Sequence, residues 1–486
     1  MPSMNLKKLF HNLDGKFVNF KDYRIKGITE NSKEVKEGFV FVTLKGTKTE
    51  GKNYVNEAVK KGAVCIVTDE KIKNINVTQF ITKDTIKIMH KILQRFYGKP
   101  DFRIIGVTGT NGKSTIANLL SFVFDKMGIK NGVIGTLSSR VGQKVIYTGY
   151  TTPPATHLYR IFNAMKKEGI EYLFMEVTSH GLEQRRIEDI ELEGLIYTGI
   201  TRDHLDFHKT MENYYQAKKK AFNLLKKSSP AIINIENLYG KRVFNEIKNL
   251  NKKSYGFYLE NLDYRIFIKY ISPEGMGVKI EYKGEIEEFE TKLIGKFNAY
   301  NICASFAMLK ELGFKEKEFV KYLAEFKGIE GRLEEIKNNL GIKIYIDYAH
   351  TPDALRACFE TLKGLLPSRI ISVFGAGGNR DKEKRPMMGR IAGEFADIII
   401  LTNDNPRYED PMKIIEDILS GIPEGEKSKV KIEPDRKKAI EMALKLADKG
   451  DIVLIAGKGH ENYMEIKGKK IPFSDKEVVK EILEKK

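Results

Sequence analysis

Short apolar runs and amphipathic segments alternate along most of the chain. Near its start, the runs GFVFVTL (38–44) and AVCIVTD (63–69) predict strands. The polar segment KGTKTEGKNY (45–54) between them predicts a surface loop. The stretch YGKPD (97–101) places Gly and Pro before a new apolar run, and it therefore predicts a linker.

Beyond this linker, the order of strand, loop and helix repeats in two series. Such alternation predicts mostly parallel sheets that helices cover on both faces. We therefore predict an α/β protein with three domains, at residues 1–98, 99–330 and 331–486. The predicted strands are RIIGVTG (103–109), YLFMEVT (172–178), GLIYTGI (194–200) and AIINIE (231–236) in the first series, and IKIYIDYAH (342–350), RIISVFGAGG (369–378), DIIILTNDNPR (397–407) and DIVLIAGKGH (451–460) in the second.

Polar or Gly-rich turns follow these strands in both series. In open α/β sheets, ligands bind beyond the carboxyl ends of the strands. The pattern therefore predicts that two α/β domains face a shared site, which is typical of an enzyme.

Composition and charge narrow the class of protein only a little. The formal charge of +18 arises from 83 Lys and Arg against 65 Asp and Glu. The lysines are spread along the chain, and many alternate with Glu, which favours solvated helix faces over a nucleic-acid surface. A pocket for anionic substrates such as nucleotides is the other interpretation of the excess. With three distant cysteines, no apolar run of about 18 residues and no signal peptide, we expect a soluble cytoplasmic protein without membrane insertion.

The segment RIIGVTGTNGKSTIANLL (103–120) predicts a phosphate-binding loop. Backbone N–H groups of a Gly-rich turn and a helix N-terminus cradle phosphates. Lys113 can neutralise the β- and γ-phosphates, and a Ser or Thr hydroxyl can bind Mg²⁺. The spacing Gly109-x-x-Gly112-Lys113-Ser114 is shorter than the general P-loop pattern. A glycine turn that merely closes a βα unit is the alternative, but the order of strand, turn, Lys and helix favours phosphate binding.

This loop, TGTNGKST, resembles the ATP loop of the Mur ligases, the ATP-dependent amide ligases of peptidoglycan synthesis, and of their folylpolyglutamate synthase relatives. Together with the motifs below, it resembles the members that add the third amino acid to UDP-MurNAc-L-Ala-D-Glu. The motifs follow in order across nearly the whole chain: TTP (151–153), MEVTSHGLEQRR (175–186), RDHLDFH (202–208), GKFNAYN (295–301), GIEGRLE (328–334), DYAHTPDAL (347–355), GAGGNRDKEKRPMMG (375–389), DNPR (404–407) and GKGHE (457–461).

The resemblance implies a particular fold and reaction. The domains would be an N-terminal α/β uridine-nucleotide-binding domain, a central P-loop ATPase-like parallel-sheet domain and a C-terminal Rossmann-like domain. The substrates would be ATP, UDP-MurNAc-L-Ala-D-Glu and a diamino acid, with Mg²⁺ as cofactor and a monomeric chain. Phosphoryl transfer to the D-Glu γ-carboxylate would give an acyl phosphate, which the incoming amine attacks to form the amide, ADP and phosphate.

The resemblance also assigns catalytic and metal-linked residues. Glu176 and His204 stand at strand ends, where each alone is better explained as a polar residue at the end of a sheet. Beside a phosphate loop they are expected to bind Mg²⁺ with Ser114, although Mg²⁺ prefers oxygen ligands. Lys218 would be carbamylated (N6-carboxylysine) and support a second Mg²⁺, whereas the pattern MENYYQAKKKAF (211–222) alone predicts a solvated helix face. Gly199 replaces the usual Asn, and we expect it to alter local packing without abolishing the site.

ATP contacts are implied for the loop and for two later segments. Asn298 and Asn301 lie three apart on a predicted helix and should share one side of it, near adenine. Arg332, Asp347 and His350 would close over the nucleotide from the third domain. The loop residues expected to bind ATP are Gly109, Thr110, Asn111, Gly112, Lys113, Ser114 and Thr115.

Contacts to the uridine-linked dipeptide are implied for two domains. Thr178 replaces the usual Ser and keeps the hydroxyl. The planar guanidinium of Arg186 has N–H donors suited to a carboxylate or phosphate. A solvated loop is the alternative interpretation for Lys48. The full expected set is Thr151, Thr152, Thr178, Gln184 and Arg186 in the central domain, and Ser32, Thr47, Lys48 and Thr49 in the N-terminal domain.

The last set would bind the incoming amino acid. The residues of DNPR (404–407) are typical of a turn. The motif also resembles the one in ligases that add meso-diaminopimelate, and not the one in ligases that add L-lysine. Arg407 would then bind the distal carboxylate that L-lysine lacks. Because L-lysine would leave Arg407 facing no carboxylate, the diacid should be preferred by at least about two orders of magnitude. meso-Lanthionine carries the same end groups and stays open. The expected set is Arg380, Asp404, Asn405, Pro406, Arg407, Gly457 and Glu461.

Three other functions are weighed against this one. An L-lysine-adding ligase of the same family would share the other motifs but would have a different motif in place of DNPR. Folylpolyglutamate synthase shares the ATP loop but lacks a separate uridine-nucleotide domain and DNPR. A P-loop protein that binds nucleic acid would show clustered arginines or stacking aromatic residues, which the sequence lacks.

Overall fold

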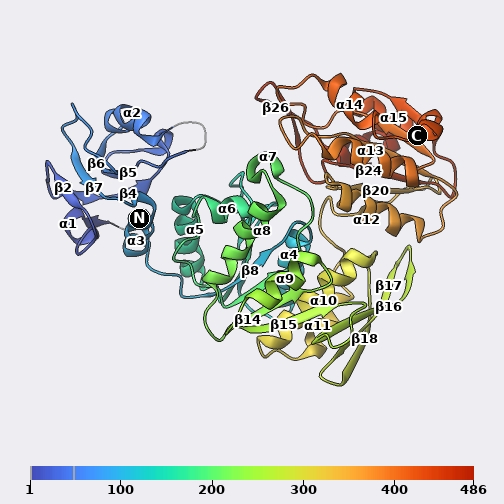
Figure 1. Cartoon of the computed structure of the whole chain (residues 1–486), viewed down its shortest axis with the longest axis horizontal. Coiled ribbons are helices and arrows are strands. Elements are labelled where there is room, and N and C mark those ends of the chain that lie inside the picture. The colour runs from blue at the N-terminus through green and yellow to red at the C-terminus, as the bar shows by residue number, and fades with distance from the viewer. Residues whose placement is uncertain (1–2, 47–49, 486) are drawn as a thin grey trace. The chain divides into compact units, whose positions relative to one another are not determined.

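The computed structural model describes residues 3–46 and 50–485 (Figure 1). The fold is mixed α/β, as predicted, and the chain divides into two compact units. The first unit contains Met1–Ile105 and Ile129–Leu192, and the second contains Gly106–Gly128 and Glu193–Lys486. Strand β8 (Arg103–Thr108) crosses the division along the chain.

The first unit begins with a five-stranded sheet in the order β2-β7-β6-β5-β4. Strands β4, β5, β6 and β7 pair in parallel with one another, and the edge strand β2 pairs antiparallel with β7. The predicted strands at 38–44 and 63–69 are confirmed as β5 and β6. The bounds in this part are β1 (Met4–Asn5), α1 (Leu6–Leu9), β2 (Lys16–Val18), β3 (Arg24–Ile25), β4 (Gly27–Thr29), η1 (Ser32–Glu34), β5 (Phe39–Val42), η2 (Gly51–Tyr54), α2 (Val55–Lys60), β6 (Ala63–Thr68), β7 (Thr78–Ile81) and α3 (Thr85–Tyr97).

The rest of the first unit is built around the predicted strand at 172–178. This strand, β12, pairs in parallel with β9, whereas β10 pairs antiparallel with both β9 and β11. The bounds are β9 (Asn131–Ile134), β10 (Ser139–Val141), β11 (Lys144–Ile146), α5 (Ala155–Glu168), β12 (Tyr172–Glu176) and α6 (Ser179–Glu183).

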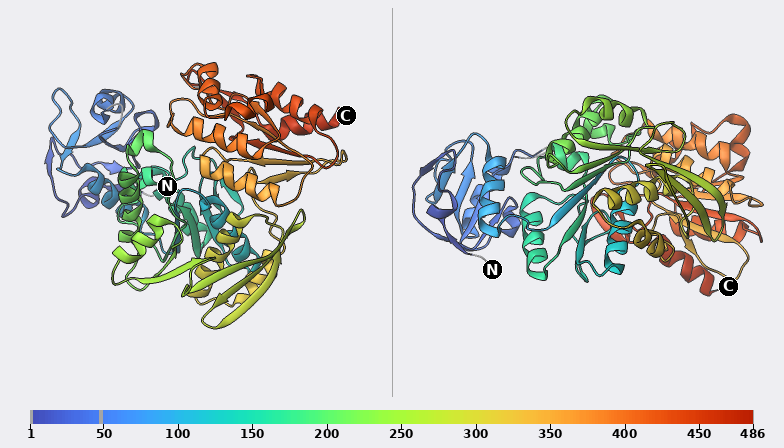
Figure 2. Two further views of the ribbon diagram at one scale, coloured as in Figure 1. Left: turned by 45° about the vertical axis from the view of Figure 1, so that its right-hand side comes forward. Right: turned by 90° about the horizontal axis from the view of Figure 1, so that it is seen from below.

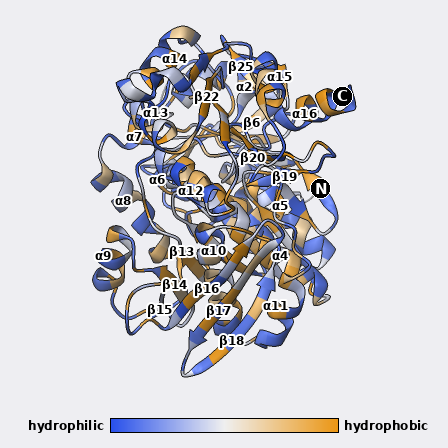
Figure 3. Cartoon of the chain, turned by 90° about the vertical axis from the view of Figure 1, so that its right-hand side faces the viewer, coloured by the Kyte–Doolittle hydropathy of each residue, from blue (hydrophilic) through white to orange (hydrophobic). Residues whose placement is uncertain are grey.

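The second unit continues with six strands in the order β13-β14-β15-β16-β17-β18. Strands β13 to β16 pair in parallel, but β16, β17 and β18 form an antiparallel ribbon, which Figure 2 shows in yellow-green. The prediction of a mostly parallel sheet missed this ribbon. Figure 3 shows hydrophobic residues along β14, β16 and β17. The strand bounds are β13 (Gly194–Tyr197), β14 (Pro230–Asn234), β15 (Asn251–Gly256), β16 (Tyr264–Ser272), β17 (Gly275–Tyr282) and β18 (Glu285–Thr291).

The C-terminal part of the second unit holds a six-stranded sheet in the order β19-β20-β24-β21-β22-β23. All neighbours are parallel except β19, which is an antiparallel edge strand. Helices cover both faces, because one apolar cluster includes residues of α12, α13 and α14, and the other includes residues of α15 and α16. The bounds of these six strands are β19 (Glu334–Ile336), β20 (Lys343–Asp347), β21 (Ile370–Phe374), β22 (Ile398–Leu401), β23 (Val430–Ile432) and β24 (Ile452–Ala456). Strands β25 (Tyr463–Ile466) and β26 (Lys469–Pro472) form a separate antiparallel pair.

The helices of the second unit complete the description. None of the helices in the described ranges is long and apolar enough to cross a membrane. Their bounds are α4 (Lys113–Lys126), α7 (Leu205–His208), α8 (Met211–Lys219), η3 (Lys220–Leu224), α9 (Leu238–Glu246), α10 (Lys296–Glu311), α11 (Glu316–Leu323), α12 (Pro352–Lys363), α13 (Lys384–Phe395), α14 (Pro411–Leu419), η4 (Glu424–Lys429), α15 (Arg436–Leu446) and α16 (Asp475–Glu484).

A buried ion pair joins α15 to α16. The Arg436 Nε and Nη2 atoms donate to the two carboxylate oxygens of Asp475 at 2.7 Å, and neither side chain is exposed. Replacing Asp475 by alanine would leave the guanidinium buried without its counter-charge. We expect the free energy of unfolding to fall by about 3–5 kcal/mol, measured by thermal or denaturant unfolding.

The same two helices provide the control for this prediction. Lys437 on α15 pairs with Glu481 on α16 at 2.8 Å, but both side chains are exposed. Because exposed pairs contribute little, Glu481→Ala should change stability far less. Equal stability losses for Asp475→Ala and Glu481→Ala would contradict the role of burial.

Candidate active site

The phosphate loop is formed by β8, a tight turn and the start of α4. Gly112 has a left-handed backbone (φ 87°), and a Cβ atom there would lie 2.4 Å from Oδ1 of Asn301. Lys113 opens the helix, and its Nζ donates to the carbonyl oxygens of Gly109 at 3.0 Å and Thr110 at 2.8 Å. The predicted strand, turn and helix are therefore present, with the helix N-terminus at the turn.

A second lysine reaches the same loop from α8. The Lys218 Nζ atom donates to the Gly109 carbonyl at 2.8 Å, and the residue is 1% exposed. The pKa of Lys218 lies well below its usual range. Burial is the largest cause, and the positive charge of Lys113 is the second. Its neighbour Lys219 pairs with Glu246 at 2.7 Å and is partly exposed. The prediction of a solvated helix face is therefore wrong for Lys218.

Two histidines flank a buried aspartate in the second unit. The Nε2 atoms of His204 and His350 lie 3.3 and 3.7 Å from Oδ2 of Asp203. Burial alone would raise the pKa of Asp203, but the two histidines and Lys384 hold it well below its usual range. Sequence reasoning selected both histidines and missed Asp203, although it lies within the motif RDHLDFH.

Gly199, where the resembling family usually has Asn, packs against Asn237, the residue just before α9. Its backbone is left-handed (φ 107°), and an added Cβ would lie 3.1 Å from the Cβ atom of Asn237. The Asn237 side chain accepts from Ile200 N at 3.2 Å and donates to Ile200 O at 2.9 Å. Glycine thus leaves room for Asn237 to hold the segment that leads to His204.

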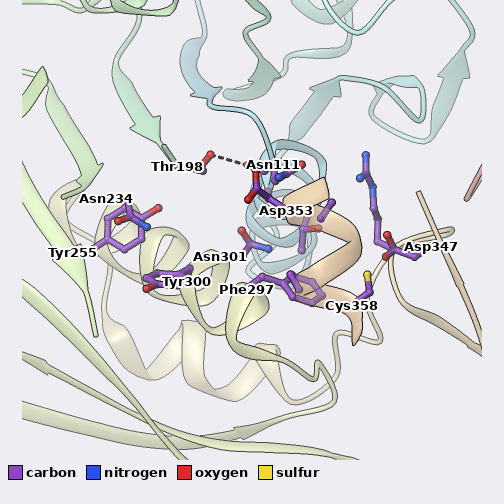
Figure 4. Close-up of a pocket in the computed structure, with 15 residues that line it drawn as sticks. Asn111, Thr198, Asn234, Tyr255, Phe297, Tyr300, Asn301, Asp347, Asp353 and Cys358 are labelled. Carbon is purple, nitrogen blue, oxygen red and sulfur yellow. Dashed lines mark hydrogen bonds between the residues drawn. The ribbon is translucent and has the colours of Figure 1, made fainter. Parts of the chain in front are cut away.

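A cavity beside the phosphate loop brings together residues of α4, α10 and α12 (Figure 4). Asn301 lines this cavity, and its Nδ2 donates to Oδ1 of Asn298 at 3.2 Å. Both asparagines therefore lie on one side of α10, as expected, with Asn298 behind Asn301. The lining residues are Asn111, Gly112, Thr115, Thr198, Asn234, Tyr255, Phe297, Tyr300, Asn301, Arg332, Asp347, Asp353, Ala354, Ala357 and Cys358.

Arg332 and Asp347 also line this cavity, whereas His350 lines the one described next. The Asp347 carboxylate accepts from Leu333 N at 2.6 Å, and burial raises its pKa. The Arg332 guanidinium lies 4.6 Å from the ring centre of Tyr348. Its buried Nε has no hydrogen-bond partner among the described residues. The aromatic walls, Phe297 and Tyr300 among them, were not predicted.

A second cavity collects most of the residues predicted to bind the incoming amino acid. The carboxylate of Glu461 accepts from Asn405 Nδ2 at 2.8 Å and from Lys458 Nζ at 3.0 Å. Lys458 is fully buried and was missed, although it lies inside the motif GKGHE. Pro406 does not line the cavity; its carbonyl accepts from Glu409 N. The lining residues are Asp203, His204, Asp206, Tyr348, His350, Gly377, Arg380, Lys384, Asp404, Asn405, Arg407, Gly457 and Glu461.

Arg407 in this cavity already has a carboxylate partner. Its Nε lies 3.1 Å from Oε2 of Glu465, and its Nη1 donates to Gly378 O at 2.7 Å. The expectation that L-lysine would leave Arg407 facing no carboxylate is therefore wrong. Glu465, 58 residues further along the chain, gave no signal in the sequence.

The first unit holds the residues predicted to contact the uridine-linked dipeptide. Both carboxylate oxygens of Glu176 accept from Thr136, at 2.8 and 3.0 Å, and Thr136 Oγ1 lies 3.0 Å from Thr151 Oγ1. Thr152 donates to the Glu176 carbonyl at 2.8 Å and accepts from the hydroxyl of Thr178 at 3.0 Å. Five threonine and glutamate side chains thus form one network at the end of β12, and Thr136 was missed.

Arg186 and Gln184 extend this network. The Arg186 Nη1 atom donates to Thr152 O at 2.6 Å, and its Nε donates to Gln184 Oε1 at 2.9 Å. Ser32 lies elsewhere in the unit and donates to Glu57 Oε2 at 2.8 Å. The predicted uridine contacts Thr47, Lys48 and Thr49 lie outside the described residues.

Family models match most of the chain. The "Mur ligase family, catalytic domain" matches residues 24–97, the "Mur ligase middle domain" matches 107–309, and the "Mur ligase, glutamate ligase domain" matches 331–459.

Relatives match over almost their whole length. The UDP-N-acetylmuramoyl-L-alanyl-D-glutamate–2,6-diaminopimelate ligase of Aquifex aeolicus is 44% identical over 466 residues, covering 95% of this chain and 94% of the relative. The enzyme of the same name from Bacteroides fragilis is 40% identical over 487 residues, covering 99% of each.

Solved structures have the same fold. A structure of a UDP-N-acetylmuramoyl-L-alanyl-D-glutamate–2,6-diaminopimelate ligase has a TM-score of 0.68 at 30% identity, covering 100% of this chain and 99% of that one. Folylpolyglutamate synthase of Mycobacterium tuberculosis, complexed with ADP and AMPPCP, has a TM-score of 0.62 at 16% identity; 75% of this chain and 91% of that one are covered. From its family matches and its full-length relatives, the chain belongs to the Mur ligase family.

Proposed function

We propose that this chain is an ATP-dependent ligase that adds the third amino acid, meso-diaminopimelate or an isostere, to UDP-MurNAc-L-Ala-D-Glu in peptidoglycan precursor synthesis. The observation that carries this proposal is the cavity that combines Arg380 and Arg407 with Asp404 and Glu461. Guanidinium groups bind carboxylates and carboxylates bind ammonium groups, so the cavity suits a zwitterionic diamino acid. Relatives named as 2,6-diaminopimelate ligases over the full chain length agree with it.

The reaction follows from the poor reactivity of a free carboxylate. Transfer of the ATP γ-phosphoryl group to the D-Glu γ-carboxylate creates a good leaving group. Attack by the amine of the diamino acid then breaks the carbon–oxygen bond and releases phosphate. The protein contributes positioning and charge neutralisation: Lys113 and the loop amides hold the phosphates, and Arg332 faces the nucleotide cavity.

The residues present fit a magnesium ion held partly by substrate. The described residues contain no cluster of three or more His, Cys, Asp or Glu side chains that could hold a metal. Mg²⁺ in nucleotide sites needs only one or two protein oxygens beside the phosphates. The Ser114 hydroxyl and a carbamate on Lys218, both in the second unit, would supply such oxygens. Glu176 and His204 are proposed as metal-linked residues on the resemblance alone. When bound, Mg²⁺ would neutralise phosphate charge.

Lys218 is proposed as the carbamylated residue. Only a neutral amine reacts with CO₂, and the lowered pKa of buried Lys218 supports this chemistry. The product is an anion beside the ammonium of Lys113, so the two groups would then attract each other.

The remaining features of the proposal concern the whole chain. The domains would be residues 1–98 for the uridine nucleotide, 99–330 for ATP and 331–486 for the amino acid. The chain would act in the cytoplasm as a monomer, without nucleic acid and without membrane insertion. In the first unit, Ser32, Thr151, Thr152, Thr178, Gln184 and Arg186 would contact the uridine-linked dipeptide.

Phosphate release tests the proposal. The enzyme is incubated with MgATP, UDP-MurNAc-L-Ala-D-Glu and a panel of amino acids: meso-diaminopimelate, meso-lanthionine, L-lysine and L-glutamate. We expect release that depends on both the nucleotide-linked dipeptide and a diamino diacid. Release with a folate substrate and L-glutamate instead would favour the folylpolyglutamate synthase alternative.

Replacing Arg407 by alanine should mainly impair use of the diacid. Because Arg407 lines the amino-acid cavity, its loss removes a partner for the distal carboxylate. We expect kcat/KM for meso-diaminopimelate to fall about 10- to 100-fold, with a much smaller change for L-lysine. Equal losses with both amino acids would contradict this role for Arg407.

A further inference from the structure

Glu465 lies directly behind the arginine that faces the amino-acid cavity. Its Oε2 is 3.1 Å from Nε of Arg407, and the two side chains are only 26% and 20% exposed. Glu465 itself does not line the cavity. It is therefore a carboxylate already in contact with the group that would bind the substrate's distal carboxylate.

Backbone contacts hold the two residues together independently of this ion pair. Arg407 N donates to Glu465 O at 3.0 Å, and Lys467 N donates to Arg407 O at 2.7 Å. Glu465 N also donates to Asn405 Oδ1 at 2.8 Å. Strand β25 is thus tied to the DNPR turn by main-chain atoms and by the Asn405 side chain, and removing only the charge of Glu465 should leave this arrangement in place.

The Arg407 guanidinium keeps donors for a ligand. Its Nε edge is taken by Glu465, and Nη1 donates to Gly378 O at 2.7 Å. Within residues 3–46 and 50–485, Nη2 has no hydrogen-bond partner. Because a guanidinium carries five N–H donors in a rigid fork, fixing one edge also fixes the direction of the other.

We propose that Glu465 is a positioning residue that sets substrate discrimination, acting as an internal counter-carboxylate for Arg407. This inference rests on the proposed function. When the bound amino acid lacks a distal carboxylate, Arg407 loses water but keeps Glu465, so its charge is not left unpaired. When the amino acid has that carboxylate, two anions share one guanidinium and repel each other. Both effects narrow the preference for the diacid.

The test compares kcat/KM for meso-diaminopimelate and L-lysine in the Glu465→Gln variant. We expect the ratio of diacid to L-lysine to rise about tenfold, because KM for L-lysine rises while kcat for the diacid is unchanged. A merely structural role would instead lower kcat for both amino acids and lower the melting temperature. Glu465→Ala provides a second variant without the carboxylate if the glutamine variant does not fold.

A double-mutant cycle with Arg407→Ala shows whether Glu465 acts through Arg407. In the Arg407→Ala background, Glu465→Gln should leave the ratio unchanged. Glu424→Gln, which removes the same charge from a side chain that is 86% exposed, should also leave it unchanged.

Three results overturn the inference. A ratio that stays constant in Glu465→Gln, or that rises equally in the Arg407→Ala background, overturns the role of Glu465 but leaves the ligase standing. An unmodified enzyme that uses neither amino acid overturns the proposed function as well.

Discussion

Replacing Lys113 by alanine is expected to lower ATP-dependent product formation by at least about a thousandfold. The Nζ atom of Lys113 lies on the phosphate loop, 3.0 and 2.8 Å from two of its carbonyl oxygens. A positive charge there stabilises the phosphoryl group as charge develops on it, and such fixed charges are among the largest single contributions to phosphoryl transfer. Lys113 is only partly buried, so the variant should remain folded.

The helix that Lys113 opens also supplies the control. Lys126 ends α4, and its ammonium pairs with Glu325 at an exposed position. Lys126→Ala should keep near-normal turnover in the phosphate-release assay. Thermal unfolding of both variants separates loss of function from loss of fold. Near-normal turnover by folded Lys113→Ala would contradict the phosphate-loop interpretation.

The second large effect is expected at Lys218. Lys218→Ala should lower turnover at least about a hundredfold, because a carbamate on this residue would supply an anion beside the ATP loop. Burial and the nearby charge of Lys113 hold the pKa of Lys218 well below its usual range, so near neutral pH the amine is more often neutral than that of an ordinary lysine. The neutral amine is the form that reacts with CO₂.

Added formate or acetate should partly restore Lys218→Ala, because a short carboxylate can occupy the place of the carbamate. The neighbouring Lys219, which pairs with Glu246 and is partly exposed, provides the matched control. Lys219→Ala should keep its activity and show no response to carboxylates. A crystal structure with ATP and Mg²⁺ bound and an unmodified ammonium on Lys218 would count against carbamylation.

Much of the fold could be predicted because its strands are short and apolar and end in polar turns. The runs at 103–109, 342–350 and 451–460 became β8, β20 and β24 for this reason. The antiparallel ribbon of β16, β17 and β18 could not be predicted in the same way. Alternating residues such as those of YRIFIKYIS (264–272) fit a strand in either direction, and the pairing depends on partners elsewhere in the sheet.

The candidate site was predictable where chemistry follows the local sequence. Lys113 is one example, because the turn before it fixes its neighbours. Asn298 and Asn301 on α10 are another, because their spacing along the helix places them side by side. Lys218 and Glu465 are not such examples. The burial of Lys218 depends on α8 packing against the phosphate loop, and the pairing of Glu465 depends on β25 lying beside the DNPR turn.

The most direct test of the account follows oxygen atoms through the reaction. UDP-MurNAc-L-Ala-D-Glu carrying isotopically labelled oxygen in the γ-carboxylate is incubated with MgATP and meso-diaminopimelate, and the products are analysed by mass spectrometry. An acyl phosphate intermediate predicts one labelled oxygen in each released phosphate and a nucleotide-linked tripeptide that retains the other. Tripeptide formed with unlabelled phosphate, or phosphate released without any tripeptide, would contradict the account.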